Sequence, residues 1–165
     1  LQNSILNGEV VTREPAYYAG GTAAAHSGQD WGNTYAEVDM SAQHMWYIQN
    51  GQVVLETDVV TGEPIPSKIT PEGVYSLMWK QPNSVLVGDI NPDTGEPAYR
   101  TKVKYWMQVT SSGVGFHDAT WQTAFGGTLY QIPGTGSHGC INMPLDQAGA
   151  LFNMIEPGTP VIFHW

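Results

Sequence analysis

Apolar and polar residues alternate along several stretches of the chain, a pattern typical of strands that bury one face. Tyr35–Asp39 alternates in this way, and residues 44–48 do so more loosely. Asn50-Gly51 follows directly and is the strongest short signal for a hairpin turn. We therefore predict that residues 53–60 return as the partner strand of a hairpin.

Four further segments are expected to be strands. They are residues 74–79, introduced by the turn Thr70-Pro71-Glu72-Gly73, residues 99–110, the glycine-containing stretch 113–118 and the closing segment 161–163. Residues 119–136 are irregular, and we expect them to form a flap that borders a site.

One helix is predicted after Pro144, because proline suits the first turn of a helix. Its apolar stripe consists of residues at three- and four-residue spacing, namely Leu145, Ala148, Leu151, Phe152 and Ile155. The predicted fold class is therefore mainly β with one main α-helix.

Residues 1–33 show neither the helical nor the strand period of apolar residues. We expect a linker or the tail of a preceding domain there, with the folded domain spanning 34–165.

Composition and charge narrow the possible functions. The 165 residues are 41% hydrophobic and 13% charged, which is typical of one globular domain. The net charge of −9 argues against nucleic acid as a partner, because a phosphate-binding surface needs clustered Lys and Arg. Cys140 is the only cysteine, so an intramolecular disulfide framework is excluded and the thiol is available for chemistry.

That cysteine lies in the turn Ser137-His138-Gly139-Cys140-Ile141-Asn142, which follows Gly134-Thr135-Gly136. A thiol is a useful nucleophile only as the thiolate, and a nearby imidazole is a common way to stabilise it. A buried cysteine can also pack as a small hydrophobe, but a polar, glycine-rich setting does not suit that role. The turn therefore predicts a cysteine acyl-transfer site.

Two histidines could serve Cys140 as the general base. His117 ends a predicted strand 23 residues upstream, where a separate element can orient it, so we favour it over His138, which is only two residues away in the turn. The carboxylate of Asp118 would point to the opposite face of the strand, which makes its backbone carbonyl a plausible partner for His117. The amides of Gly139 and Cys140 could form an oxyanion hole.

Together, the stretch from His117 to Asn142 and its closing Ser-His-Gly-Cys turn resemble the L,D-transpeptidase catalytic domain family, of the Gram-positive type. The likeness covers about residues 34–165 and includes Gln43-to-Gly51, the turn at 70–75 and the aromatic strand Tyr105-Trp106-Met107. It implies a β-sandwich-like fold, Cys140 as nucleophile, and His117 as a base oriented by the carbonyl of residue 118. It also implies that His138 and Ser137 support the turn.

The resemblance further implies a substrate class. The family uses the peptidoglycan tetrapeptide stem as acyl donor, releases terminal D-alanine, and passes the acyl group to an amine of a second stem, giving a 3→3 cross-link. We expect the substrate to be bound by Trp106, Met107, Trp121, Tyr130 and Asn142, although Ser137 and Asn142 could equally serve as turn residues. The likeness also implies acylation by carbapenem-type β-lactams, no metal or cofactor, and a role in cell-wall biogenesis and cell shape. We expect a monomer outside the cytoplasm, at the cell wall or anchored to the membrane through a part outside this chain.

Other interpretations fit the residues less well. Sortases need an arginine after the cysteine, and the last arginine here is Arg100; papain-like wall peptidases place the cysteine first, and only His164 follows Cys140. A zinc site from His117, His138 and Cys140 has enough ligands but no recognised spacing. Two alternatives stay open: an L,D-carboxypeptidase that hydrolyses the same thioester, and a non-catalytic wall-binding module, in which the Cys140 turn would have no purpose.

Overall fold

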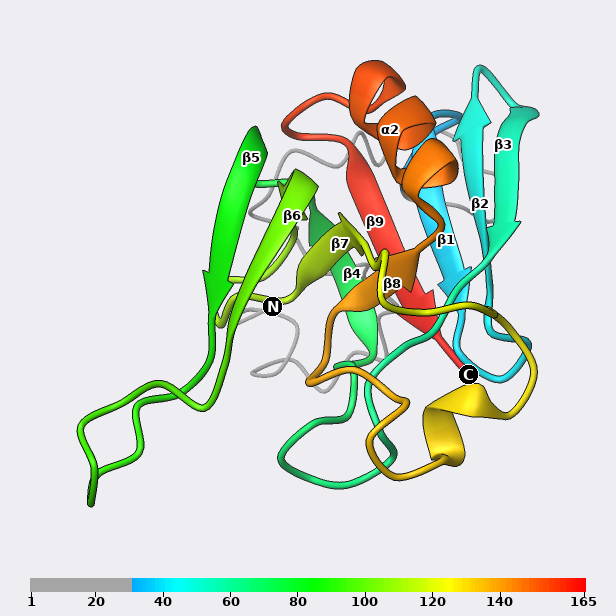
Figure 1. Ribbon diagram of the computed structural model, residues 1–165. Coiled ribbons are helices and arrows are strands. Elements are labelled where there is room, and N and C mark those ends of the chain that lie inside the picture. The colour runs from blue at the N-terminus through cyan, green and yellow to red at the C-terminus, as the bar shows by residue number, and fades with distance from the viewer. Residues whose placement is uncertain (1–30) are drawn as a thin grey trace, which may run out of the picture. The chain divides into compact units, whose positions relative to one another are not determined.

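The computed structural model describes residues 31–165, of which residues 33–165 form one compact unit built from two β-sheets and one α-helix (Figure 1). The first sheet has the strand order β3-β2-β1-β9-β4. Its strands are β1 (Tyr35–Asp39), β2 (His44–Gln49), β3 (Gln52–Asp58), β4 (Gly73–Ser76) and β9 (Pro160–His164). All neighbours in this sheet are antiparallel except β1 and β9, which run parallel.

The second sheet carries the chemistry-bearing residues and has the order β5-β6-β7-β8. Its strands are β5 (Trp79–Val87), β6 (Arg100–Gln108), β7 (Gly115–Asp118) and β8 (Ile141–Met143). The pair β7 and β8 is parallel, which brings segments from either side of the irregular stretch 119–136 together. That stretch contains the short 3-10 helix η1 (Leu129–Gln131).

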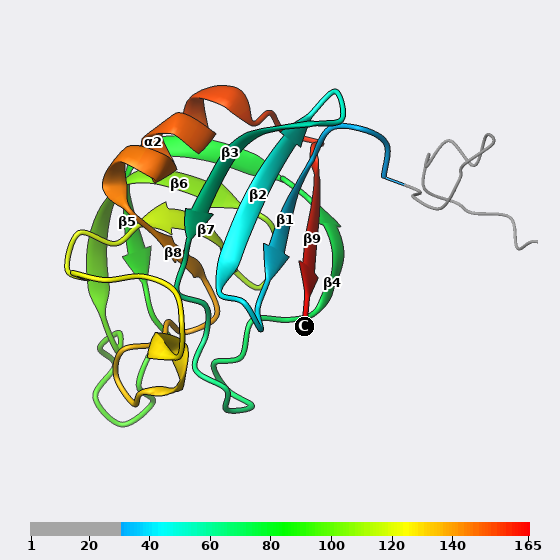
Figure 2. The same ribbon diagram turned by 90° about the vertical axis from the view of Figure 1, so that its right-hand side faces the viewer.

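Helix α2 (Leu145–Met154) closes one end of the domain, where it contacts strands of both sheets (Figure 2). The core lies between the sheets and under the helix, and its largest fully buried side chains include Tyr47, Phe116, Phe163 and Leu151. The Lys80 ammonium reaches from β5 to the carbonyls of Phe152 and Ile155 at 2.9 and 2.7 Å, so it satisfies acceptors that the end of the helix leaves without partners.

The mainly β fold class is confirmed, and so are the hairpin and the helix. Asn50 and Gly51 have φ of 53° and 78°, the left-handed values that a two-residue hairpin turn requires. Helix α2 begins directly after Pro144 and exposes the polar face opposite its apolar stripe.

The prediction of one strand over residues 74–79 is wrong. These residues belong to two strands in different sheets, and the chain crosses between the sheets at Leu77 and Met78. Leu77 is buried at the crossing, and its amide bonds the Thr159 carbonyl beside the first sheet, whereas Met78 bonds Gln108 of the second. The continuation of β5 to residue 87 was also missed, because Pro82 and Asn83 interrupt the pattern and proline is tolerated on an edge strand.

The expected linker or tail at 1–33 lies almost wholly outside the described residues and stays a prediction. Within residues 31–165, α2 is too short and too polar to cross a membrane, and no other helix is long enough to do so.

Candidate active site

The Ser137–Cys140 turn is held by a strap of residues 60–70 from the loop before β4. Backbone hydrogen bonds of 3.0 Å join Ser137 N to the Thr61 carbonyl and Glu63 N to the Ser137 carbonyl. The buried Thr70 hydroxyl donates to the Gly139 carbonyl at 2.8 Å and accepts from the amide of Gly62 at 2.9 Å. The strap therefore fixes the backbone on both sides of the turn.

Inside the turn, the Ser137 hydroxyl both donates and accepts a hydrogen bond. It donates to the Cys140 carbonyl at 2.5 Å and accepts from the Gly139 amide at 3.0 Å. The Gly139 amide is therefore already occupied, so the expected oxyanion hole of two amides is reduced to one. The Cys140 amide has no acceptor among residues 31–165, and it is the backbone donor that stays available to a developing oxyanion.

His117 lies on β7 directly beside Asn142 of β8, so both side chains project from the same face of the sheet. The ring is buried between the indoles of Trp106 and Trp121, with centroid distances of 6.0 and 5.9 Å. Its Nδ1 is 3.0 Å from the backbone carbonyl of Asp118. A carbonyl only accepts, so Nδ1 carries the proton and Nε2 of the neutral ring is left free to accept one.

The Asp118 carboxylate points away from the imidazole. Its Oδ1 accepts hydrogen bonds from the amides of Lys104 and Tyr105, both at 2.8 Å, and so anchors β6 to β7. The partner of His117 is therefore the main-chain carbonyl, and the Asp118 side chain is structural.

Burial acts on both members of the cysteine–histidine pair. Desolvation raises the pKa of the Cys140 thiol to about 11, and a backbone contact with Gly115 offsets only part of this. Desolvation likewise lowers the pKa of His117, against the smaller opposite effects of the Asp118 carbonyl and carboxylate. At neutral pH the pair is therefore a neutral thiol and a neutral imidazole, and the thiol lies 3.6 Å from the Gly113 carbonyl as a donor. Any attack by this thiol would therefore require the transfer of its proton in the same step.

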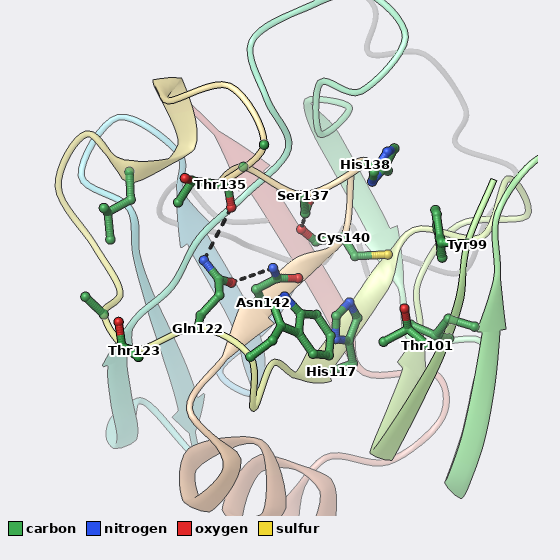
Figure 3. A pocket seen from close by; sticks show the side chains of 16 residues that line it. Tyr99, Thr101, His117, Gln122, Thr123, Thr135, Ser137, His138, Cys140 and Asn142 are labelled. Carbon is green, nitrogen blue, oxygen red and sulfur yellow. Dashed lines mark hydrogen bonds between the residues drawn. The ribbon is translucent and has the colours of Figure 1, made fainter.

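Cys140 lines two pockets. One, of about 430 Å³, lies between the turn and the 119–136 segment and includes His117, Trp121 and Asn142 (Figure 3). The other, of about 550 Å³, lies along β5 and β6 and includes Trp79 and Trp106. Lys, Arg, Asp and Glu are absent from the lining of both.

The sequence-predicted substrate residues are only partly brought together. Trp121 and Asn142 line the first pocket and Trp106 the second. Met107 is completely buried in the core, so its expected substrate contact does not hold. Tyr130 is also buried, lies against Trp165 and lines neither pocket.

Three residues that the sequence did not single out also shape the site. Tyr99 lines both pockets, and its ring centroid lies 5.0 Å from that of His138. In Figure 3, His138 lies on the far side of Cys140 from His117. Gln122 bonds Asn142, and Thr70 anchors the Gly139 carbonyl. Only Thr70 carried a local signal, as the first residue of the Thr-Pro-Glu-Gly turn; the other two are recognisable only once the chain is folded.

A metal centre is not indicated by the arrangement. Residues 31–165 contain no group of three or more His, Cys, Asp or Glu side chains placed to hold an ion. The alternative zinc site at His117, His138 and Cys140 therefore has no geometric support.

A β-sandwich-like domain with a cysteine that lines two pockets, and a histidine that shares one of them, has the layout of an acyl-transferring enzyme. The family model of the L,D-transpeptidase catalytic domain matches residues 33–163, and the chain belongs to this family. Among curated proteins it is similar to L,D-transpeptidase 1 of Mycobacterium tuberculosis, at 30% identity over 126 residues, which is 74% of this chain and 47% of that protein. It is also 31% identical to the probable L,D-transpeptidase 3 of that organism over 59% of this chain and 35% of that protein. The chain thus spans less than half of the length of these relatives.

Solved structures agree with this family. A crystal structure of an Enterococcus faecium L,D-transpeptidase mutant is similar at a TM-score of 0.74 and 42% identity, covering 98% of this chain and 60% of that one. The catalytic domain of the E. faecium enzyme acylated by ertapenem, solved by NMR, matches at a TM-score of 0.67 and 46% identity, covering 80% of this chain and 97% of that domain.

Proposed function

We propose that this domain is a peptidoglycan L,D-transpeptidase that forms 3→3 cross-links through a thioester on Cys140. In the first step, the Cys140 sulfur attacks the carbonyl of the third stem residue while His117 Nε2 takes the thiol proton. The C–N bond to terminal D-alanine then breaks, His117 protonates the leaving amine, and the acyl group stays on sulfur. In the second step, an amine of another stem attacks the thioester, His117 accepts its proton, and the thiol is restored.

The observation that carries this proposal is the position of Cys140 between two pockets. A transfer between two peptide substrates needs space on both sides of the acyl carbon, one side for the donor and one for the acceptor. A hydrolase needs only a donor pocket and access for water. The two cavities of about 430 and 550 Å³, both lined by Cys140, therefore favour a transferase over an L,D-carboxypeptidase.

The hydrogen bonds around the pair support the same chemistry. His117 has its tautomer set by a fixed carbonyl, and the Cys140 amide is directed by the Gly139 peptide that Thr70 holds. Preorganised donors and a preset tautomer need no rearrangement when charge develops in the transition state. His138 and Ser137 have supporting roles in this proposal, and no step passes through a metal or cofactor.

Carbapenems are proposed as covalent inhibitors that acylate Cys140, since the related E. faecium catalytic domain is acylated by ertapenem. Peptidoglycan as substrate implies that the domain works outside the cytoplasm, which we propose as its location. The proposed partners are the donor and acceptor stems, with the domain acting as a monomer.

The test is incubation with purified tetrapeptide stems, with the products and the intact protein followed by mass. We expect release of D-alanine and cross-linked dimers from the natural sequence, and neither from Cys140→Ala at an unchanged melting temperature. Release of D-alanine without dimers would make the enzyme a carboxypeptidase. Dimer formation by Cys140→Ala above background would overturn the thioester mechanism.

A further inference from the structure

The side-chain oxygen of Asn142 is a buried hydrogen-bond acceptor without a partner. Asn142 is only 3% exposed, and nothing in residues 31–165 donates to its Oδ1. The residue nevertheless lines the first pocket together with Cys140 and His117. A buried polar atom without a partner costs free energy, so such an atom beside a substrate pocket indicates a contact that the substrate completes.

A relay of two amides fixes which end of Asn142 faces the pocket. The Thr135 carbonyl can only accept, so the Gln122 side chain turns its amino group to it, at 3.3 Å. The Gln122 oxygen then faces Asn142 and accepts from Nδ2 at 2.6 Å. Figure 3 shows the Asn142 oxygen turned toward the side where Cys140 and His117 lie. Reversing the Asn142 amide would set its oxygen against that of Gln122, so the relay opposes it.

The position of this oxygen relative to the reacting groups follows from the sheet. Asn142 is the register partner of His117 and follows Cys140 by two residues. Its backbone is fixed by two hydrogen bonds with Val60, of 2.9 and 3.0 Å. The oxygen is therefore held beside Cys140 and His117, on the side of the pocket formed by the 119–136 segment.

We propose that Asn142 Oδ1 accepts a peptide N–H of the acyl donor, and that Gln122 is a positioning residue that keeps the oxygen in the pocket. This inference rests on the proposed transpeptidase function. It assigns a specificity: a donor with an N–H at this point is accepted, whereas one with an ester oxygen places two acceptors against each other. An unpaired buried polar group costs about 1–3 kcal/mol, which corresponds to roughly fivefold to 150-fold in selectivity.

The test is a cycle that removes the N–H from the substrate and the oxygen from the protein. Three donors are compared: the tetrapeptide, its analogue with an ester in place of the scissile amide, and its analogue with an ester before the third residue. Loss of the C-terminal residue is followed by mass, as kcat/KM, for the natural sequence and for Asn142→Leu. The ratio between protein forms cancels the greater intrinsic reactivity of an ester.

For each protein form, the kcat/KM of an ester analogue is divided by that of the tetrapeptide. We expect this ratio to be at least fivefold lower in the natural sequence than in Asn142→Leu for one of the two ester analogues. The analogue that shows the loss identifies the N–H, either that of the leaving group or that of the acyl side. If the Asn142→Leu protein does not fold, Asn142→Ala provides the same cycle with a smaller side chain. Gln122→Met should weaken the discrimination partially, while the same substitution at Gln147, on the outside of α2, should leave it unchanged.

Modification of Cys140 by methyl methanethiosulfonate, a reagent without an N–H, separates this role from a structural one. Its rate should change less than twofold in Asn142→Leu and Gln122→Met, since neither side chain is hydrogen-bonded to the thiol or to the imidazole. Equal discrimination in all protein forms, with the tetrapeptide still turned over, would overturn this inference alone. No turnover of the tetrapeptide by the natural sequence would overturn the proposed function and this inference with it.

Discussion

Asp118→Asn separates the two ways in which a histidine base can be oriented. The substitution keeps the backbone carbonyl that lies 3.0 Å from His117 Nδ1 and removes only the charge of a side chain that points to β6. We therefore expect the rate of Cys140 acylation to fall less than tenfold, a change of under about 1.4 kcal/mol in the barrier. If the carboxylate were instead the third member of a triad, the loss would approach the roughly 10⁴-fold seen in serine proteases.

The same change should be visible in stability. The Asp118 Oδ1 accepts two backbone hydrogen bonds of 2.8 Å, and an asparagine oxygen can still accept both without the charge. Losing charge assistance on two bonds costs about 2 kcal/mol in the free energy of unfolding. For a domain of this size, that lowers the melting temperature by about 4–8 °C.

Acylation is measured with a carbapenem as the shift in intact mass over time, which needs no acceptor peptide. Asp39→Asn is the matched control, because Asp39 Oδ1 also accepts two backbone amides, at 2.8 and 2.9 Å, in the turn after β1 and away from the site. It should lower stability without changing acylation. A loss beyond a hundredfold in Asp118→Asn, at a stability matching that of the control, would refute the carbonyl-oriented arrangement.

Three further predictions follow from the same geometry. Burial raises the pKa of Cys140 to about 11, so the thiolate absorbance at 240 nm should rise only above about pH 10. Burial lowers the pKa of His117 below 6.5, so acylation should increase as His117 loses its proton and then stay level through pH 8–9. A thiolate signal at pH 6 would contradict the neutral pair. His117→Gln should slow acylation by roughly 10²–10⁴-fold, and His138→Gln by less than tenfold, since His117 is the proposed base; the reverse order in the mass assay would exchange their roles. Lys80→Met should lower the free energy of unfolding by about 1–3 kcal/mol in urea titrations, because it removes the hydrogen-bond donor to the carbonyls at the end of α2. Acylation should stay unchanged. Unaltered stability would show that water replaces the ammonium there.

Local signals in the chain were sufficient for much of the fold. The Asn50-Gly51 turn and the apolar stripe of α2 depend on residues a few positions apart, so their conformations follow from short-range sterics and periodicity. The Cys140 turn is local in the same sense, since its glycine has φ of 120° and Ser137 bonds within four residues.

Features that depend on which segments pack together could not be obtained in this way. Nothing near Leu77 signals that the chain changes sheets there, because the change is decided by Thr159 and Gln108 far along the chain. Met107 adjoins Trp106 in an aromatic stretch that looked like a binding strand, yet its side chain faces the core.

The sequence by itself therefore predicted most of the strands, the helix, and Cys140 with two histidines as the candidates for the chemistry, because these are carried by single residues and short patterns. Only the tertiary structure decided how they act. The direction of the Asp118 carboxylate, the orientation of the Asn142 amide through Gln122, and the neutral state of Cys140 and His117 all arise from distant elements. Hydrogen-bond partners and desolvation belong to the packed environment, and that environment exists only once the two sheets, the strap and the 119–136 segment have come together.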